Sequence, residues 1–562
     1  MHTTTPMRST SSFCHLLAIF DSWISQQLIN RAPNTVLTDR QAYTTTTRKM
    51  VDRRWLWGLY VLLVVCRLLW GVRLPGYIHP DEFFQGGQDL FFGCTEFIPW
   101  EFHQDNAVRS IVPPALMTWL PLKVYATLTN QNVQHLAGRE TLWIPRHFLA
   151  FLSVLTIDAA SFALVPDVWI LLVLSTSWTS WALLIRPFTN SLESMILVLL
   201  LLAARQRTLP FDFVVGVLCG VGVFTRFTFV FFALPTGIHY LWSRRWDFRA
   251  ILVAATGFLA STIIVVLADL QYYGAPWEDW ASFLTPLNAC LYNLKVDNLQ
   301  KHGIHPHWTH ALVNMFLMFG PLALLFYVDL YQSVRALLRQ KSLERTDTVF
   351  AWTVVVGLGL LSMAPHQEPR FLLPLLTPLT LLLARRLKNR WFLVFWFAFN
   401  SVVLMVFGVL HQGGIVSALL ADEYGQGEPE AIVFFRTYMP PSFVSRTKCQ
   451  HDDKQVCHKD TCNSAPLVDL QTSDVQQMAI ALKELLSCET DSTAQLIAPW
   501  TNEGGVLLSR DACYLGHDLD CQPRLSLWPH LTTEDFPTVG PTIHETLSRF
   551  QLSIFEVACT AP

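Results

Sequence analysis

A histidine and two adjacent carboxylates follow the first long apolar run of this chain. The run ends near Trp70, and His79, Asp81 and Glu82 come shortly after it. Ionisable groups at the mouth of a membrane helix are costly unless they are paired or used, so this stretch is a candidate functional site. One carboxylate could act as general base for a hydroxyl nucleophile while the other orients or binds. A plain polar loop beside the membrane is the alternative.

Two further polar stretches interrupt apolar runs and could contribute to the same site. The first, from His366 through Glu368 to Arg370, precedes a run rich in leucine. An arginine beside the bilayer suits a phosphate group, because its paired donors carry a charge that never titrates. The second stretch runs from Arg186 to Glu193. The alternatives are structural: Glu368 pairs with Arg370 at the end of a span, and Arg186 pairs with Glu193 across a turn.

The composition predicts a polytopic α-helical membrane protein. Of the 562 residues, 15% are charged and 52% are hydrophobic, whereas about a quarter of a soluble chain is charged. Apolar runs of roughly 20 residues, the length of a membrane-spanning helix, recur throughout. The net charge of −3 argues against a nucleic-acid partner. A transporter is an alternative, although the two halves of the sequence lack the internal similarity that many transporters carry.

About eleven apolar runs are predicted to cross the bilayer from a cytosolic N-terminus, which places the tail in the lumen. The strongest basic loops, such as 385–390, then face the cytosol, as the positive-inside rule requires. The loops 73–107, 271–311 and 366–370 face the lumen together with the tail. The predicted spans are 55–72, 109–127, 142–165, 168–185, 190–204, 211–240, 250–270, 312–331, 349–365, 371–384 and 391–410.

Parts of the middle of the chain disagree with this count. Arg186 falls on the cytosolic side, away from the other two polar stretches, and Arg205 and Arg207 fall in the lumen, against the rule. The run 211–240 is too long for one straight crossing and carries Arg226 near its centre. A broken or re-entrant pair of helices is therefore an alternative there.

The two ends of the chain differ from the spanning part. Residues 1–54 form a polar extension, predicted to be cytosolic and disordered, and Met50 could serve as an alternative start. Residues 411–562 are polar, and the seven cysteines there favour an oxidising compartment, with an odd thiol left over. We expect a small lumenal α/β domain in this region. Its predicted elements are a helix over 475–486 and strands over 495–498 and 505–508.

The three polar stretches resemble the signatures of a known family. They read Tyr-Ile-His-Pro-Asp-Glu-Phe-Phe-Gln over 77–85, Arg-Pro-Phe-Thr-Asn-Ser-Leu-Glu over 186–193 and His-Gln-Glu-Pro-Arg-Phe-Leu-Leu-Pro over 366–374. In this order they are similar to motifs of the dolichyl-phosphate-mannose-dependent α-mannosyltransferases of the endoplasmic reticulum. Within that family, the first and third spellings most resemble members that add the fourth mannose to the glycosylphosphatidylinositol (GPI) precursor.

The resemblance implies a C-type glycosyltransferase (GT-C) architecture with a lumenal active site in the endoplasmic reticulum membrane. Mannose would come from a β-linked lipid phosphate and enter an α1,2 linkage, which inverts the anomeric centre. The lipid donor dolichyl-phosphate-mannose, the GPI-precursor glycolipid and the bilayer are the implied partners, and no cofactor is expected. The alternatives are addition of the third GPI mannose, extension of the lipid-linked N-glycan precursor, or a non-catalytic scaffold.

The resemblance also assigns roles to the carboxylates of the first motif. An inverting displacement needs one base for the acceptor hydroxyl, and the leaving phosphate needs no acid. Asp81 is the expected base, and Glu82 assists in acceptor binding or orientation. No metal is expected, because one phosphate needs little charge compensation and the spacing of His79, Asp81 and Glu82 matches no standard ligand pattern.

The remaining motif residues are assigned to substrate binding. Arg370 and His366 are expected to hold the leaving phosphate, where charge builds in the transition state. Arg186 is a weaker candidate for the same task. The full set of expected substrate-binding residues is His79, Gln85, Arg186, His366, Glu368 and Arg370.

Overall fold

The computed structural model describes most of the chain after the N-terminal extension. The described residues are 54–92, 98–301, 303–338, 348–421, 431–443, 467–471, 473–486, 492–516, 518–532, 537–538 and 540–560. Residues 59–562 form one compact unit, and 1–58 form another. The predictions that concern 1–53, Met50 and four of the tail cysteines (Cys449, Cys457, Cys462 and Cys488) lie outside the described residues.

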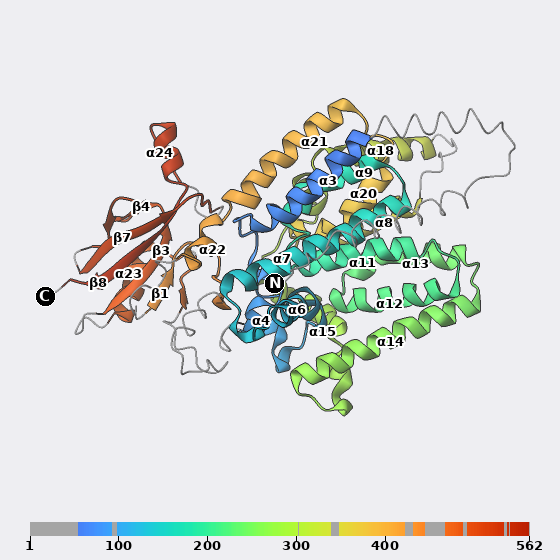
Figure 1. Cartoon of the computed structure of the whole chain (residues 1–562), viewed down its shortest axis with the longest axis horizontal. Helices are drawn as coiled ribbons and strands as arrows, with labels where there is room; N and C mark the ends of the chain where they lie inside the picture. The colour runs from blue at the N-terminus through green and yellow to red at the C-terminus, as the bar shows by residue number, and fades with distance from the viewer. Residues whose placement is uncertain are drawn as a thin grey trace, which may run out of the picture. The chain divides into compact units, whose positions relative to one another are not determined.

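The chain up to residue 421 is built mainly from helices (Figure 1). The first α-helices are α3 (Arg54–Leu69), α4 (Gln88–Phe92), α5 (Val112–Pro114), α6 (Leu120–Leu128), α7 (Gly138–Ser153), α8 (Ala159–Leu164), α9 (Val168–Thr176), α10 (Trp178–Ala182) and α11 (Thr189–Ala203). They are followed by α12 (Leu209–Thr225), α13 (Phe229–Ser243), α14 (Phe248–Tyr273), α15 (Thr285–Asn293), α16 (Val296–Gln300), α17 (Met315–Phe319), α18 (Pro321–Leu338), α19 (Thr348–Ser362), α20 (Leu376–Leu382), α21 (Arg390–Val403) and α22 (Gly413–Leu419).

Short helical turns connect or extend these helices. The π-helical turns are η6 (Ala115–Trp119), η8 (Val154–Asp158), η10 (His310–Asn314) and η12 (Leu404–Leu410). The 3₁₀ turns include η2 (Pro80–Glu82), η4 (Trp100–Phe102), η9 (Trp277–Phe283) and η11 (Pro369–Leu375).

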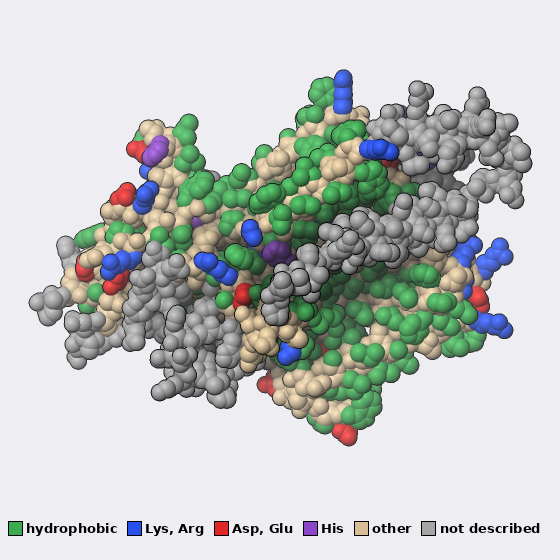
Figure 2. Space-filling model, viewed as in Figure 1, with side chains coloured by type: hydrophobic (Ala, Val, Ile, Leu, Met, Phe, Trp, Pro, Cys, Tyr) green, Lys and Arg blue, Asp and Glu red, His purple; other side chains and the backbone are tan. Residues whose placement is uncertain are grey.

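Several helical segments are long and apolar enough to cross a membrane. Four of them meet both criteria: Arg54–Arg73, Gly138–Leu164, Phe248–Tyr273 and Arg390–Leu410. Figure 2 shows hydrophobic side chains over much of the helical part, and the exposed residues of α14 include Leu252, Leu259 and Ile264. So large an exposed apolar surface suits lipid rather than water. The predicted class, a mostly helical membrane protein, is confirmed at this level.

The long run 211–240 is broken into two helices. α12 ends at Thr225, and Arg226 adopts an extended conformation (φ −156°, ψ 133°) before α13 begins at Phe229. α12 packs against both α11 and α14 (Figure 1). The alternative of a broken pair of helices is therefore present, and the break places a charged residue between two apolar helices.

The run 109–127 forms a helix that packs against the tail. Leu122 and Ala126 of α6 belong to an apolar cluster with Ile415 of α22 and Phe434 of the tail. The preceding turn is held to the first loop, because the Thr118 hydroxyl donates to the carbonyl of Gly86 over 2.6 Å. The buried face of this helix is thus used by the first loop and the tail.

The tail contains a five-stranded sheet in the order β2-β1-β3-β8-β7 (Figure 1). β1 pairs in parallel with β2 and β3, and β8 pairs antiparallel with β3 and β7. Cys513 and Cys521 form a disulfide, consistent with an oxidising compartment. The strands are β1 (Ala431–Phe434), β2 (Leu467–Asp469), β3 (Thr493–Pro499), β7 (Leu519–Leu527) and β8 (Leu552–Cys559). A second, three-stranded sheet contains β4 (Thr501–Glu503), β5 (Val506–Leu508) and β6 (Cys513–Tyr514).

The two faces of the five-stranded sheet bury different partners, because successive strand residues point to opposite sides. On one face, Val433 and Phe555 pack with Met478 of helix α23 (Val475–Leu485). On the other, Phe434 and Ile554 join a cluster that contains residues of the first loop and α22. The tail helix predicted over 475–486 and the strands predicted over 495–498 and 505–508 are confirmed by α23, β3 and β5. Helix α24 (Ile543–Ser548) precedes β8.

Candidate active site

The turn η2 sets the directions of the two adjacent carboxylates. Pro80 begins the turn, where its fixed φ and missing N–H are tolerated. The His79 imidazole accepts a hydrogen bond from the amide of Asp81 over 3.2 Å and so caps the turn. With about three residues per turn, neighbouring side chains of a 3₁₀ helix point about 120° apart. Asp81 therefore faces a cavity, whereas Glu82 faces the protein interior.

Glu82 is fully buried between two guanidinium groups. Its Oε1 accepts from Nε of Arg146 over 2.8 Å, and its Oε2 accepts from Nη1 of Arg186 over 2.7 Å. Arg186 also donates to the carbonyl of Gly76 over 2.6 Å. A buried carboxylate needs such partners, since an unpaired charge inside a protein is very costly. Glu82 thus stabilises the position of the first loop. The described residues that line the cavity do not include Glu82.

The contact between Glu82 and Arg186 does not fit the order of crossings predicted from the sequence. Three predicted spans, an odd number, separate the two residues and place them on opposite sides of the membrane. The two side chains form an ion pair, which requires them to lie on the same side. The run 109–127 is the one packed against the first loop and tail. Arg186 pairs with Glu82 and not with Glu193, so that structural alternative is wrong.

A chain of ion pairs joins the first and third motifs. Arg370 donates to both Asp81 and Glu368, and Nε2 of His366 lies 2.8 Å from Glu368. His79 lies 3.7 Å from each of the two carboxylates. The Asp81 and Glu368 side chains are each 19% exposed, which leaves room for a ligand. Residues from two distant parts of the sequence therefore share one charged network.

The charges in this network set the protonation of its members. Burial alone would raise the pKa of Asp81, but Arg370 and His79 outweigh it and lower the pKa below its ordinary value. Burial opposes ionisation of Glu368 as well, yet Arg370 and His79 hold its pKa well below the usual range. Burial lowers the pKa of His366, but its hydrogen bond to Glu368 reverses that and raises the pKa. Both carboxylates are therefore ionised at neutral pH.

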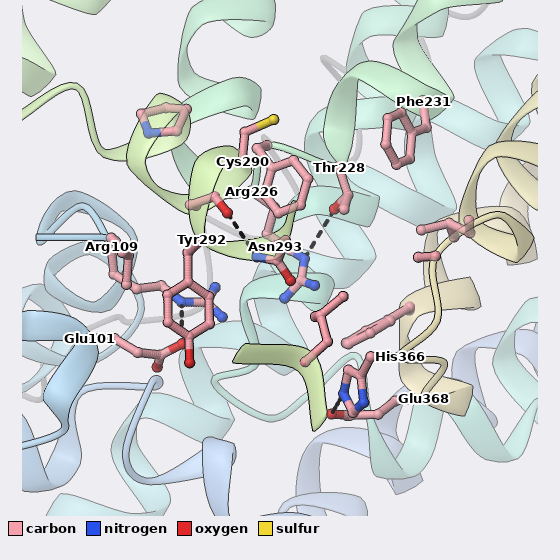
Figure 3. A pocket seen from close by; sticks show the side chains of 18 of the residues that line it. Glu101, Arg109, Arg226, Thr228, Phe231, Cys290, Tyr292, Asn293, His366 and Glu368 are labelled. Carbon is pink, nitrogen blue, oxygen red and sulfur yellow. Dashed lines mark hydrogen bonds and ion pairs between the residues drawn. The ribbon is translucent and has the colours of Figure 1, made fainter. Parts of the chain in front are cut away.

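The network opens into a cavity of about 660 Å³ (Figure 3). Arg226, from the break between α12 and α13, points into this cavity. Its Nη1 donates to the hydroxyl of Thr189 over 3.2 Å, and its Nε lies 3.5 Å from Glu193. The guanidinium also lies 4.9 Å from the ring centroid of Phe371, a cation–π distance. The second motif thus contributes to the cavity by orienting Arg226.

The opposite wall of the cavity comes from the first loop and α15. Glu101 accepts hydrogen bonds from Nε of Arg109 over 3.1 Å and from Nε2 of Gln85 over 3.3 Å. The rings of Trp100 and Tyr292 lie beside this group, with centroids 4.8 Å apart. Gln85 lines the cavity and is hydrogen-bonded there to Glu101, a partner that the sequence did not indicate.

Most of the predicted site residues meet in this cavity. His79, Asp81, Gln85, His366, Glu368 and Arg370 line it. Glu82 and Arg186 are close by but buried behind it. Five residues that the sequence alone did not indicate also line the cavity: Arg109, Arg226, Glu101, Trp100 and Tyr292. Of these, only Arg226 carried a signal, as a charge inside an apolar run. Within the described ranges, no group of three or more His, Cys, Asp or Glu side chains is arranged to hold a metal ion.

Comparisons with known proteins agree with the motifs. Residues 58–441 match the model of the Alg9-like mannosyltransferase family. GPI mannosyltransferase 4 of Candida albicans is 30% identical, with 78% of this chain and 89% of that protein covered. The human GPI alpha-1,2-mannosyltransferase 4 is 32% identical over 69% of this chain and 75% of its own length. The structure of ArnT from Cupriavidus metallidurans, solved with undecaprenyl phosphate, is 11% identical and covers 80% of this chain and 93% of the ArnT chain. Its TM-score is 0.49, which is too low to support a conclusion.

The chain belongs to the Alg9-like mannosyltransferase family and is a glycosyltransferase. The family resemblance of the three motifs is thereby confirmed, and an enzyme is favoured over a transporter or a scaffold. Several of the relatives carry the name GPI mannosyltransferase 4, in agreement with the spellings of the first and third motifs.

Proposed function

We propose that this chain is the α1,2-mannosyltransferase that adds the fourth mannose to the GPI precursor, with dolichyl-phosphate-mannose as donor. The observation that carries the proposal is a cavity in which one partly exposed carboxylate, Asp81, contacts Arg370 next to apolar helices. This arrangement suits a base facing a sugar whose leaving group is an anionic lipid phosphate. The named relatives support the choice of acceptor within the family.

The chemistry is a single inverting displacement. The 2-hydroxyl oxygen of the third acceptor mannose attacks C1 of the donor mannose, while the bond from C1 to the phosphate oxygen breaks. The electron pair of that bond leaves on dolichyl phosphate, and Asp81 takes the proton of the hydroxyl. No covalent sugar–enzyme intermediate forms. We propose that the reaction requires neither a metal ion nor a cofactor.

The leaving phosphate is proposed to lie between Arg226 and Arg370. Both guanidiniums line the cavity, and each can donate paired hydrogen bonds to phosphate oxygens. The apolar side chains of Phe227 and Phe231 line the cavity on the α12–α13 side and suit the start of the dolichyl chain. His366, with its raised pKa, can supply a further donor.

Donor binding is also proposed to activate the base. Burial raises the pKa of Asp81, but its ion pair with Arg370 outweighs burial and lowers the pKa, which makes this carboxylate a weak base. A phosphate that draws Arg370 away from Asp81 reduces this stabilisation and raises the basicity of the carboxylate. The base then becomes effective only when a donor is present.

We further propose a GT-C architecture with eleven crossings and a lumenal active site in the endoplasmic reticulum. The crossings are those of the sequence prediction, except that 112–128 stays on the lumenal side and α12 and α13 cross separately. One span is lost and one gained, so the number is unchanged. Arg186 then lies in the lumen, and Arg205 and Arg207 lie in the cytosol, as the positive-inside rule prefers.

The test compares microsomes that contain the wild-type chain with microsomes that contain Asp81→Asn. Both receive labelled dolichyl-phosphate-mannose and a GPI precursor with three mannoses, in buffer with a metal chelator. We expect the wild type to form a four-mannose product that α1,2-mannosidase shortens, and the variant to form at least 10³-fold less, on the order of a lost base. Wild-type product on a two-mannose or N-glycan precursor instead would point to another acceptor of the family.

Arg226→Ala separates phosphate binding from proton transfer. This variant keeps the base but lacks one guanidinium, so we expect weaker inhibition by the product dolichyl phosphate. Arg139→Ala, which replaces an exposed arginine outside the cavity, is the matched control. Full product from Asp81→Asn would remove this residue as the base, and unchanged product inhibition in Arg226→Ala would remove Arg226 from the phosphate site.

A further inference from the structure

The cavity has two chemically different ends. The apolar end is lined by Phe227 and Phe231 near the break between α12 and α13. The other end carries rings and hydrogen-bonding groups from the first loop and α15. Figure 3 shows Phe231 well apart from Tyr292, Glu101 and Arg109, with Arg226 between them. A ligand that is lipid at one end and sugar at the other meets matching surroundings across this cavity.

An aromatic corner defines the polar end. The rings of Trp100 and Tyr292 line the cavity with centroids 4.8 Å apart and planes inclined by 35°. Trp100 is 37% exposed and lines the cavity, so part of its ring is accessible to a ligand. A pyranose ring presents C–H groups on one face, and these pack well on an aromatic face. The corner therefore has the shape and polarity of a sugar-stacking surface.

Hydrogen-bonding groups surround this corner. The Glu101 and Arg109 side chains form an ion pair at 3.1 Å, and they are 15% and 20% exposed. A paired carboxylate and guanidinium can bind neighbouring sugar hydroxyls as acceptor and donor. Glu101 is linked to the base-bearing turn, because Gln85 donates to it and the amide of Gln85 donates to the carbonyl of Asp81 over 3.1 Å. The corner is thus connected to the proposed base.

The geometry of the reaction decides which sugar occupies this corner. In a single displacement the attacking oxygen and the leaving oxygen lie on opposite sides of C1. If the phosphate lies at Arg226 and Arg370, beside the apolar end, the acceptor must approach from the opposite end. That end is the corner of Trp100, Glu101 and Tyr292.

We infer that Trp100 and Tyr292, with Glu101 and Arg109, form a subsite for a neutral α-mannoside, namely the terminal mannosyl residues of the acceptor glycan. The inference rests on the proposed function for the identity of the acceptor. The rings stack on the sugar faces, and the ion pair binds the hydroxyls. This subsite fixes the acceptor hydroxyl beside Asp81 without touching the donor lipid.

The test measures acceptor binding separately from turnover. The purified full-length wild type is titrated with a soluble α-linked mannotrioside and compared with Trp100→Ala and Tyr292→Ala. Trp277→Ala is the matched control, since Trp277 is an exposed tryptophan outside the cavity. In turnover with dolichyl-phosphate-mannose and the three-mannose precursor, the KM for acceptor should rise about tenfold in both variants while the KM for donor changes less than twofold. Mannotrioside binding should weaken by the same factor, and Trp100→Phe, which keeps a ring, should retain most of it.

Each result decides between the alternatives. A rise in the donor KM alone would assign the corner to the donor mannose and overturn the inference, as would unchanged values for both substrates. Mannotrioside binding that depends on Trp100 and Tyr292, in an enzyme that fails to elongate the GPI precursor, would support the subsite and contradict the proposed function. Thermal melting of every variant shows whether a lost signal reflects unfolding.

Discussion

Asp81 and Glu82 are neighbours in the chain but have different environments. Asp81 is partly exposed to the cavity, whereas Glu82 is buried between Arg146 and Arg186. A carboxylate enclosed by two guanidiniums and sealed from the cavity cannot reach a substrate hydroxyl. We therefore assign Glu82 a positioning role, because its ion pairs stabilise the turn that carries Asp81.

This assignment predicts that Glu82→Gln destabilises the protein. The amide fills the same space but leaves two buried guanidiniums without a negative charge, and breaking such a buried pair costs about 3–5 kcal/mol. We expect a clearly lower melting temperature for Glu82→Gln in detergent, and a smaller loss for Asp81→Asn, because Arg370 keeps its ion pair with Glu368. Adding Arg146→Met to Glu82→Gln removes one unbalanced charge and should restore part of the melting temperature. A Glu82→Gln protein that is fully stable yet inactive would instead make Glu82 a catalytic residue.

At the scale of elements, the tail is hydrogen-bonded directly to the loop that carries Asp81. Asp89 of α4 is buried, and its Oδ1 accepts from the hydroxyl of Ser442 over 2.9 Å and from the amide of Phe443 over 2.8 Å. The amide of Tyr77 donates to the carbonyl of His411 over 2.9 Å. The tail thus contacts the first loop through hydrogen bonds from residues outside its strands.

The Asp89 contact predicts a pH-dependent stability. Burial raises the pKa of Asp89 to about 7, since its two hydrogen bonds compensate only in part. A carboxyl whose folded pKa exceeds its unfolded value stabilises the fold at low pH and loses that contribution as pH rises through 7. Between pH 6 and pH 8 the loss amounts to about 1.4 kcal/mol. Asp89→Asn keeps the acceptor oxygen and cannot ionise. As the pH rises from 6 to 8, its melting temperature should therefore increase relative to that of the wild type.

Melting curves of both proteins at several pH values test this expectation. Asp105→Asn, at an exposed aspartate of the same loop, is the matched control and should follow the wild type. Equal pH dependence in the wild type and Asp89→Asn would show that Asp89 does not titrate in this range.

The limits of sequence-based prediction are also clearest at this scale. Contiguous motifs gave Asp81, Arg370 and most of the network, because the chemistry of each motif is local. Hydropathy could not separate 112–128 from a crossing. One face of this segment packs on the first loop and the tail, and its other face exposes apolar side chains such as Trp119 and Val124, so the whole run is apolar. No sequence pattern links Trp100 to Tyr292, because the two residues are far apart in the chain and only the fold brings their rings together.

For the whole molecule, the position of Arg186 determines the topology of the first half. If Glu82 and Arg186 are in contact, an even number of crossings must separate them, and α7–α8 and α9–α10 supply two. In the proposed topology, the segment after α6 lies in the lumen, and the turn between α11 and α12 lies in the cytosol. The eleven spans predicted from sequence place both segments on the opposite sides.

Cysteine labelling in sealed microsomes distinguishes the two topologies. Gln131→Cys marks the segment after α6, and Gln206→Cys marks the turn between α11 and α12. A membrane-impermeant maleimide added outside should label Gln206→Cys at once and Gln131→Cys only after detergent opens the vesicles. The wild-type chain under the same conditions gives the background from its native cysteines. The reverse pattern would show that 109–127 crosses the membrane and that Arg186 lies on the cytosolic side. Arg186 and Glu82 would then be on opposite sides, which would contradict their buried ion pair beside η2.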